Sequence, residues 1–381
     1  MNRILLSLTI FLFLSCKNKK EEASTNLDKT VTSTLKYATG FTVKKESTGI
    51  TIIKITAPWP NATKGFSYAL VPEEKMAALT LNKDSYDAII TTPVKKIIVT
   101  STTHIPVLEA LGVETSLVGF PNTNYISSMA TRKRIANKQV KELGNNESLN
   151  TEIALELQPN VVIGFGIDNQ NKAYKTLEDA NIPVAYNGDW AEQTPLGKAE
   201  WIKFFAPFFH KETKADSIFN SIEKEYHKVK ELAAKANTKH TVLSGAMFKD
   251  VWYLPGGKSW AAQYLNDANT NYLWKDDKET GSLSLSWENV LNIAQNADYW
   301  LSPSQYTTYE QMKESSPHYT QFKAFKNKNI YTFANTKGPT GGLLFYELAP
   351  SRPDIVLRDL ISIFHPEVLP NYKPYFYKPL E

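Results

Sequence analysis

The 381-residue sequence contains one cysteine, Cys16, so no two cysteines are available for a disulfide within the chain. Beyond its first 16 residues it also lacks an apolar run of the roughly 20 residues that a membrane-spanning helix needs. A strong charge imbalance is missing too, because 43 Lys and Arg face 39 Asp and Glu, a formal net charge of +4. These absences exclude a disulfide scaffold and a body that crosses the membrane through helices, and nothing in the charge indicates nucleic acid.

Aromatic residues are plentiful by contrast, at 12% of the chain with 19 Tyr and 8 Trp. That is more than packing alone predicts, and sugars, flat macrocycles and catechols bind on aromatic surfaces. Hydrophobic residues make up 42%, which is typical of a globular body. A body of about 345 residues exceeds what one core usually serves, so we expect two domains.

The first 15 residues have the parts of a signal peptide. Arg3 gives the positive start, residues 4–14 the apolar stretch, and Ser15 the small residue before the cut. Cys16 directly after that cut resembles the lipobox of bacterial lipoproteins, although Phe13 stands where Leu is usual. We therefore predict a lipid-anchored protein of the cell envelope that faces the periplasm, the alternative being an ordinary signal peptide with an incidental cysteine.

A flexible tether is predicted for residues 16–36. This segment is rich in Lys, Glu, Ser and Thr and shows no apolar periodicity, so it cannot bury enough surface to fold. Residues 20–22, Lys-Glu-Glu, are also similar to a short surface-export tag, which leaves exposure at the cell surface open.

The first lobe is expected over residues 37–212. Apolar and polar residues alternate between 37 and 71 and predict an antiparallel hairpin or meander. From residue 95 short buried strands alternate with helices, which favours a parallel sheet covered by helices.

One long helix and a second lobe follow. Apolar residues recur at spacings of three and four between 213 and 237 and predict a helix of about 35 Å. Alternating strands and helices resume over 238–381. The predicted architecture is therefore two α/β lobes joined by one bridging helix, with an extra N-terminal hairpin.

The order of several segments resembles the ABC-importer substrate-binding proteins that take up ferric siderophores, haem and cobalamin. The segments are Ser-Thr-Thr-His-Ile-Pro-Val-Leu-Glu-Ala-Leu-Gly at 101–112, the stretch from Leu149 to Pro159, the long helix, and Leu-Ser-Trp-Glu-Asn-Val-Leu at 285–291. The resemblance covers residues 95–375, and the hairpin before it departs from the smaller members. It implies a class III binding protein with a single bridging helix that performs no chemistry.

The resemblance also implies partners. In that family a glutamate on each lobe docks on an arginine pocket of the permease dimer, which works with ATPase subunits, and the matching positions here are Glu152 and Glu288. Both also stand near an expected helix start, where a carboxylate favours the helix dipole, and that remains the alternative. We expect a monomer that touches the membrane through its lipid anchor only.

Ligands of open α/β sheets bind outside the carboxyl ends of the strands. This rule selects loops rich in aromatic residues on both lobes, although ordinary packing is an alternative for each ring. Lysines there could attract an anionic chelate or merely be solvated, and the one histidine could contact cargo or start a helix. The candidates are His104, Tyr125, Phe165, Tyr186, Trp190, Trp252, Lys258, Trp260, Tyr306 and Lys337.

The cargo is expected to be a chelate rather than a bare metal ion. The other five histidines are scattered and do not form the His and carboxylate set of a zinc or manganese carrier. We expect no cofactor besides this iron or cobalt chelate. A surface-exposed glycan-binding lipoprotein is an alternative function, and a secreted hydrolase a weaker one, because no Gly-x-Ser-x-Gly or His-Glu-x-x-His motif is present.

Overall fold

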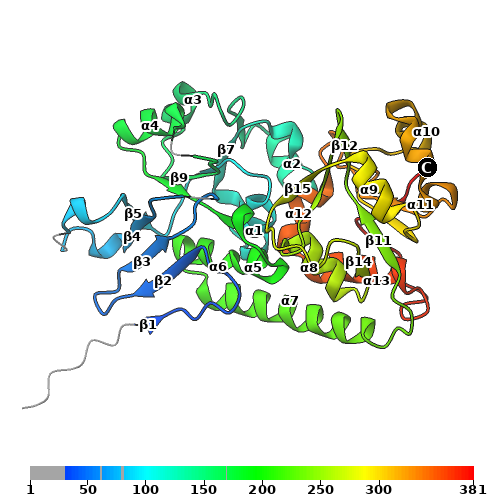
Figure 1. The fold of residues 1–381 in the computed structure, drawn as a ribbon. Coiled ribbons are helices and arrows are strands. Elements are labelled where there is room, and N and C mark those ends of the chain that lie inside the picture. Colours follow the sequence, from blue (N-terminus) through cyan, green and yellow to red (C-terminus); the bar gives the residue numbers. More distant parts are fainter. Residues whose placement is uncertain (1–30, 61, 79–80, 169) are drawn as a thin grey trace, which may run out of the picture.

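The computed structural model describes residues 31–60, 62–78, 81–168 and 170–381. The predicted signal peptide, Cys16 and most of the predicted tether lie outside these residues. The described chain forms two α/β lobes side by side, with one long helix, α7, running along both (Figure 1). This is the predicted fold class.

The first lobe contains a five-stranded sheet in the order β10-β9-β6-β7-β8, with every neighbouring pair parallel. Its strands are short and three are buried along their whole length, as expected for a sheet covered on both faces. The strands are β6 (Ile97–Val99), β7 (Leu117–Phe120), β8 (Lys141–Glu142), β9 (Val161–Gly164) and β10 (Val184–Tyr186). The helices between them are α1 (His104–Leu111), α2 (Met129–Ala136), α3 (Thr151–Leu157) and α4 (Lys172–Asp179), with 3-10 turns η3 (Glu114–Ser116) and η4 (Thr123–Tyr125).

The N-terminal segment forms a larger sheet than the predicted hairpin over 37–71. Its five strands are β1 (Val31–Thr32), β2 (Phe41–Lys45), β3 (Thr51–Ile55), β4 (Phe66–Pro72) and β5 (Ala88–Thr92), in sequence order. The first four pair antiparallel, whereas β5 pairs parallel with β4. A crossover with the 3-10 turns η1 (Glu73–Lys75) and η2 (Lys83–Ser85) separates β4 from β5, so alternation along the chain could not show their pairing.

This N-terminal sheet shares one hydrophobic core with the first lobe. Phe41 and Leu70 of the sheet belong to the same buried cluster as Val99 of β6. Phe204 and Phe208, from the segment between β10 and α7, belong to this cluster too. The sheet is therefore built into the lobe rather than attached as a separate domain.

The segment between β10 and α7 is divided into several short elements. It consists of the turn η5 (Asp189–Ala191), α5 (Pro195–Glu200), α6 (Ile202–Phe205) and η6 (Ala206–Phe209). Pro207 lies in η6, where its missing N–H and fixed φ are tolerated only in a first turn. The chain is nonetheless almost fully buried here, at the centre of the molecule.

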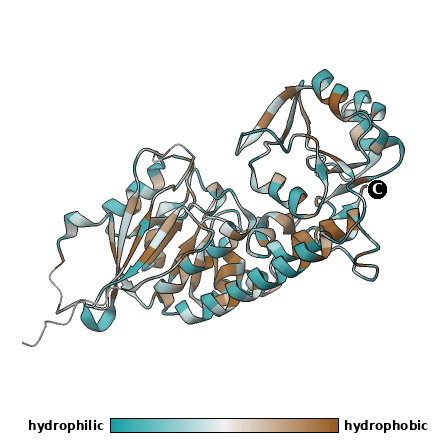
Figure 2. Ribbon diagram, turned by 60° about the horizontal axis from the view of Figure 1, so that its bottom comes forward, coloured by the Kyte–Doolittle hydropathy of each residue, from teal (hydrophilic) through white to brown (hydrophobic). Residues whose placement is uncertain are grey.

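Helix α7 (Glu212–Ala233) is the bridging element, predicted over 213–237. Its 22 residues correspond to about 33 Å. Phe219 and Ile222 in its first half pack into the core of the first lobe, whereas Tyr226 and Val229 in its second half pack into the core of the second. Its outer side is mostly hydrophilic (Figure 2). The amphipathic stripe thus joins both cores along one rod.

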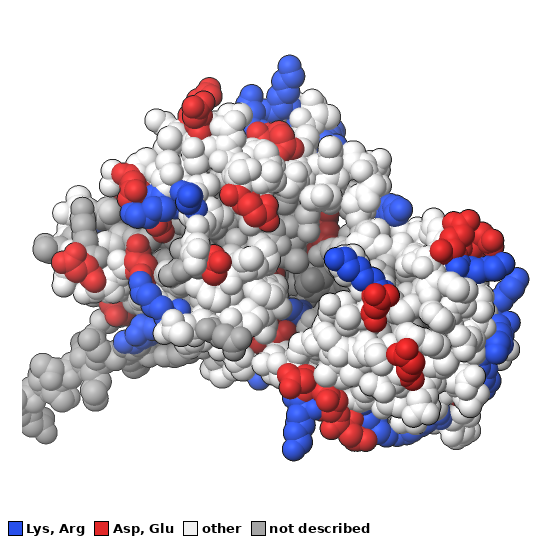
Figure 3. Space-filling model, turned by 45° about the horizontal axis from the view of Figure 1, so that its top comes forward, with Lys and Arg blue, Asp and Glu red and all other residues white. Residues whose placement is uncertain are grey.

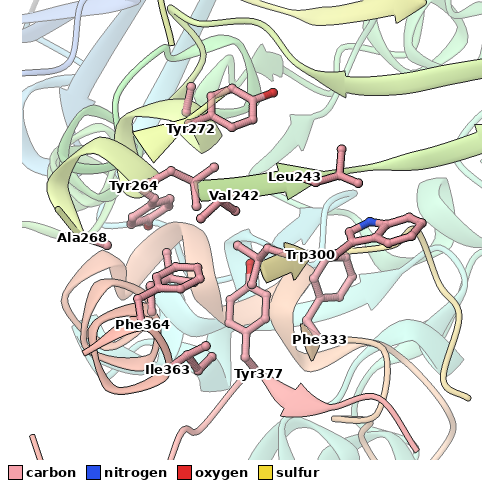
Figure 4. Close-up of a cluster of buried hydrophobic side chains, with 14 of the residues drawn as sticks. Val242, Leu243, Tyr264, Ala268, Tyr272, Trp300, Phe333, Ile363, Phe364 and Tyr377 are labelled. Carbon is pink, nitrogen blue, oxygen red and sulfur yellow. The ribbon is translucent and has the colours of Figure 1, made fainter. Parts of the chain in front are cut away.

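The second lobe has a five-stranded sheet in the order β14-β11-β16-β17-β18 and a three-stranded antiparallel sheet in the order β12-β13-β15. Aromatic rings gather around β11 in its core (Figure 4). The strands are β11 (Thr241–Ser244), β12 (Ala246–Phe248), β13 (Val251–Pro255), β14 (Asn271–Tyr272), β15 (Ser282–Ser286), β16 (Tyr299–Leu301), β17 (Ile330–Thr332) and β18 (Lys378–Pro379). The helices are α8 (Trp260–Asp267), α9 (Trp287–Ala294), α10 (Tyr309–Ser315), α11 (Lys323–Lys326), α12 (Leu344–Leu348) and α13 (Pro353–Phe364), with 3-10 turns η7 (Pro317–Gln321) and η8 (Ala349–Ser351).

The lobes are also joined at a second place, near α12. The buried carboxylate of Glu347 accepts hydrogen bonds from the backbone N–H groups of Ser127 and Ser128, the latter at 2.9 Å. Thr340 Oγ1 donates to the carbonyl oxygen of Asn124 at 2.7 Å. Because the lobes are tied both here and along α7, we expect them to close through small movements only.

Within the described ranges, no helix combines the length and apolar character that crossing a bilayer requires.

Candidate ligand-binding site

A cavity of about 740 Å³ lies between the two lobes. This volume is in the range of small-molecule and cofactor sites. Its wall combines three parts of the chain: Ala57, Trp59, Pro60 and Ala62 between β3 and β4 of the N-terminal sheet, residues 190–193 after β10, and several loops of the second lobe. The hollow between the lobes is visible in Figure 3.

Trp190 is an aromatic residue of the first lobe that lines this wall. It lies on η5, directly beyond the carboxyl end of β10, and its ring packs on Phe165 with centroids 5.6 Å apart. Its indole Nε1–H is buried and has no hydrogen-bond partner among the described residues. A buried indole N–H usually finds an acceptor, so this unpaired donor is unusual, and because it is buried it is not exposed to the cavity.

Trp260 is the corresponding ring on the second lobe. It is the first residue of α8, whose N-cap Ser259 accepts from the N–H of Ala262 at 3.2 Å. The turn before it needs glycine, because a Cβ atom at Gly257 would lie 2.4 Å from the carbonyl oxygen of Asp277. The turn at Gly257 and the Ser259 cap together place the indole of Trp260 at the cavity wall.

Lys198 connects these two tryptophans. Its ammonium donates to the carbonyl oxygen of Trp190 at 2.8 Å and of Asp189 at 3.1 Å, and lies 5.4 Å from the ring centroid of Trp260. Burial lowers the pKa of Lys198 to about 8, against the opposing effect of the Asp189 and Glu192 carboxylates. One side chain therefore positions both cavity rings, although it does not itself line the cavity.

The lowered pKa of Lys198 predicts a pH-dependent stability. Below pH 8 the folded chain carries the full cost of burying the charged Lys198 ammonium. Between pH 8 and about 10.5 the folded chain has lost this proton while the unfolded chain still holds it, so the cost falls as the pH rises. The free energy of unfolding of the wild type, relative to Lys198→Met, should therefore rise by about 2 kcal/mol between pH 7.5 and 10. Urea unfolding at both pH values measures this difference.

The exposed Lys54 offers a matched control for this comparison. Lys54→Met should follow the wild-type pH profile, because this side chain is exposed in the folded chain and so has no burial cost to lose. Parallel profiles of the wild type and Lys198→Met would contradict the assigned burial cost.

The cavity wall is nearly free of charge. Of the described residues that line it, Glu192 alone carries a charged side chain. This carboxylate is already bonded, because it accepts from the N–H groups of Thr39 at 2.7 Å and Gly40 at 2.8 Å and from the indole N–H of Trp201 at 3.1 Å. The wall thus presents no lysine or arginine to an anionic ligand.

His104 lies outside the cavity wall, at the start of α1. It is 1% exposed, its ring packs on Phe205 with centroids 5.1 Å apart, and neither ring nitrogen has a partner among the described residues. Burial lowers its pKa, and the nearby Asp189 opposes that shift. The imidazole is therefore held neutral in the core of the first lobe, where it cannot touch cargo in the cavity.

Trp190 and Trp260 are the two predicted candidates that line the cavity. Phe165 and Tyr186 lie behind the first wall, where Phe165 packs on Trp190 and Tyr186 is 6% exposed in a core cluster. Trp252 is a correction, because it is 0% exposed in the core of the second lobe and its Nε1–H donates to the carbonyl oxygen of Ser244 at 3.1 Å. It has no surface to offer to a ligand.

The remaining four candidates lie away from the cavity wall, and their side chains contact solvent or residues nearby in the sequence. The exposed ones are Tyr125 on η4, Lys258 and Lys337, and the half-buried Tyr306 hydrogen-bonds Ser315 and packs on Tyr319. The two lysines are therefore not placed to attract an anionic chelate into the cavity.

The sequence interpretation missed several rings that do line the cavity. Two signals could have indicated some of them: Trp59 stands between prolines in a turn between two strands, and Tyr253 alternates with the buried Trp252 on one strand. The others follow no local pattern. The missed aromatic residues of the wall are Trp59, Tyr253, Tyr264, Phe333, Phe345, Tyr346 and Tyr377.

Glu152 and Glu288 occupy equivalent places on the two lobes. Each is exposed at the second position of its helix, α3 or α9, behind a capping side chain, Asn150 or Ser286. Neither forms an ion pair within the described ranges. Both helices lie on the side of the molecule away from α7 (Figure 1).

No cluster of three or more His, Cys, Asp and Glu that could hold a metal ion occurs in the described part of the chain.

Comparisons with known proteins agree with this geometry. A family profile described as periplasmic binding protein matches residues 97–336. The uncharacterized lipoprotein MJ0878 of Methanocaldococcus jannaschii is 27% identical over 298 residues, which cover 76% of this chain and 69% of the relative. Two solved structures share the fold at 18% identity. One is a possible iron-binding, periplasmic solute-binding protein of Staphylococcus epidermidis (TM-score 0.57, 72% of this chain and 100% of that one). The other is a periplasmic haem-binding protein of Pseudomonas aeruginosa (TM-score 0.56, 76% and 98%).

Proposed function

The chain belongs to the periplasmic binding protein family, and from this premise we propose that it captures a metal chelate of low net charge and delivers it to an ABC importer. The cargo would be a corrinoid or a ferric chelate, held between the lobes. Binding and release suffice for this role, so no residue is assigned a catalytic part.

The aromatic cavity between the lobes carries this proposal. Rings from both lobes, among them Trp190 and Trp260, border one space of about 740 Å³. Aromatic faces bury large apolar area and stack on flat surfaces, so they suit a macrocycle or a broad chelate.

The charge of the wall narrows the class of chelate. A strongly anionic ferric catecholate would have to leave water without a cationic partner, because Glu192 is the charged side chain at the wall and already holds backbone N–H groups. A neutral corrinoid or a neutral or cationic ferric hydroxamate meets no such cost. Low net charge is therefore the property that we expect the cavity to select.

Envelope attachment and docking complete the proposal. Cys16 would carry the lipid anchor, and residues 16–30 would tether the described body to the membrane surface. Glu152 and Glu288, exposed on one side of the two lobes, would each meet an arginine pocket of the permease dimer. One monomer presents both carboxylates, so no second copy is needed.

A binding panel tests the cargo assignment. The purified protein is titrated with cyanocobalamin, ferrioxamine B, haem, a ferric tricatecholate and a soluble polysaccharide, and binding is followed by tryptophan fluorescence and calorimetry. We expect cyanocobalamin or ferrioxamine B to bind at least about a hundredfold more tightly than the tricatecholate, because an unpaired buried charge costs several kcal/mol. Tightest binding of the tricatecholate would overturn the charge argument, and binding of the polysaccharide alone would favour a glycan-binding lipoprotein.

A further inference from the structure

The loop between β3 and β4 belongs to the N-terminal sheet and yet borders the cavity with four of its described residues, Ala57, Trp59, Pro60 and Ala62. The matched family range begins at residue 97, so this loop lies outside it. We propose that the N-terminal sheet is a cargo-recognition element, in which Trp59 contacts a flat face of the cargo and selects for macrocyclic chelates. The inference rests on the proposed function and adds a third wall to its site.

Trp59 is held in a defined place by other rings. Its centroid lies 5.4 Å from that of Tyr186 and 5.9 Å from that of Phe66, both in edge-to-face geometry. The residue remains half-exposed, so part of the indole is left to face the cavity. A ring fixed on one side and open on the other loses little entropy when it stacks on a ligand.

The loop is also fastened to the wall that carries Trp190. A Cβ atom at Gly188 would lie 2.4 Å from the carbonyl oxygen of Ala57, so this close approach needs glycine. The N–H groups of Thr56 and Ala57 donate to the carbonyl oxygen of Gly40 at 2.8 and 3.4 Å. The N–H of Gly40 in turn donates to Glu192, which itself borders the cavity.

A second carboxylate secures the same N-terminal segment. Glu200, 0% exposed, accepts from the N–H groups of Lys36, Tyr37 and Ala38 at 2.8 to 3.0 Å and pairs with the buried Lys203 at 3.0 Å. Charge-assisted bonds of this kind are the strong ones. Buried charge-assisted bonds therefore fasten the start of the N-terminal sheet to the first lobe.

The chemistry of the loop indicates what it recognises. The four residues at the wall offer one indole, one proline ring and two methyl groups, and no charge. Such a surface is complementary to a flat apolar face and makes few specific contacts with a compact, rounded chelate. Trp59 should therefore favour a flat macrocycle of low net charge, such as a corrinoid, over a globular trihydroxamate.

The test compares Trp59→Ala and Trp59→Leu with the wild type, using cyanocobalamin, haem and ferrioxamine B as probes in calorimetry. Loss of a buried indole face should weaken binding of the macrocycle that the wild type binds by at least about tenfold, with a smaller loss for Trp59→Leu. Ferrioxamine B affinity should change by less than about threefold. Trp287→Ala is the matched control, because this half-buried indole stacks on His318 away from the cavity.

The outcomes separate this inference from the proposed function. A wild type that binds none of the chelates overturns the proposed function and the inference with it. A wild type that binds a macrocycle as tightly as both variants leaves the proposed function standing and overturns the role of Trp59. Equal losses for the macrocycle and ferrioxamine B would overturn the selectivity, and unchanged thermal unfolding of Trp59→Leu excludes misfolding as the cause of a loss.

Discussion

Reversing Glu152 and Glu288 together to lysine should lower cargo uptake by cells at least about a hundredfold while the cargo affinity of the purified protein stays unchanged. Each carboxylate is exposed on its own lobe, and we propose that each meets an arginine pocket. A lysine in that place turns an attraction into a repulsion, and two reversals remove both contacts that orient the body over the permease. Uptake of radiolabelled or fluorescent cargo measures the effect.

The double reversal has a matched control on the same surface. Glu156 is exposed on α3 and Glu310 is exposed on α10, so Glu156→Lys with Glu310→Lys changes the net charge equally. This control should retain uptake. Because Glu152 and Glu288 also favour the dipoles of their helices, each reversal should cost about 0.3–1 kcal/mol of stability, which thermal unfolding can check. Normal uptake by the double variant would remove the docking assignment and leave the dipole role.

Replacing Trp190 and Trp260 together by alanine should weaken cargo binding at least about a hundredfold, the largest effect expected on affinity. The two rings come from different lobes and border one cavity, so each loses its own contact area with the cargo. Calorimetry is the suitable measurement because the variants lose fluorescent reporters.

The single variants show how this loss is shared. Trp190→Phe keeps an aromatic face but removes the N–H, so a loss greater than about threefold would indicate a hydrogen bond to the cargo. Lys198 contacts both residues, through the carbonyl oxygen of Trp190 and the ring of Trp260. The affinity losses of the two single alanine variants therefore need not add up to that of the double variant. Unchanged affinity in the double variant would exclude the cavity as the cargo site.

Local patterns predicted the helices well where a polar face and an apolar stripe coexist. α1 occupies His104–Leu111 and ends at Gly112, whose φ of 70° is the left-handed conformation that glycine adopts readily. α7 is similarly clear because its buried residues recur at helical spacing. The element boundaries within residues 195–209 are harder to predict. Nearly every residue there is buried, so no amphipathic stripe shows where α5, α6 and η6 begin and end.

Side-chain direction explains why most candidate ligand residues lie elsewhere. The rule that ligands bind beyond the carboxyl ends of strands selects loops, but it does not say which ring of a loop faces the cavity. On β13, successive side chains point to opposite faces, so Trp252 is 0% exposed in the core whereas Tyr253 is 43% exposed at the cavity wall. Applying this alternation to the sequence would have selected Tyr253 instead of Trp252 as the ligand candidate.

The amino-acid sequence by itself determined the α/β class, the two lobes and the bridging helix, because these depend on periodicities within about 20 neighbouring residues. Only the tertiary structure decided that the N-terminal sheet joins the first lobe and that Trp59 reaches the cavity. Those outcomes depend on contacts such as Glu192 to Gly40 and Glu200 to Tyr37, whose partners are 152 and 163 residues apart. No local sequence pattern predicts such a contact, because the contact forms, and stabilises the protein, only after both segments have packed on the same core.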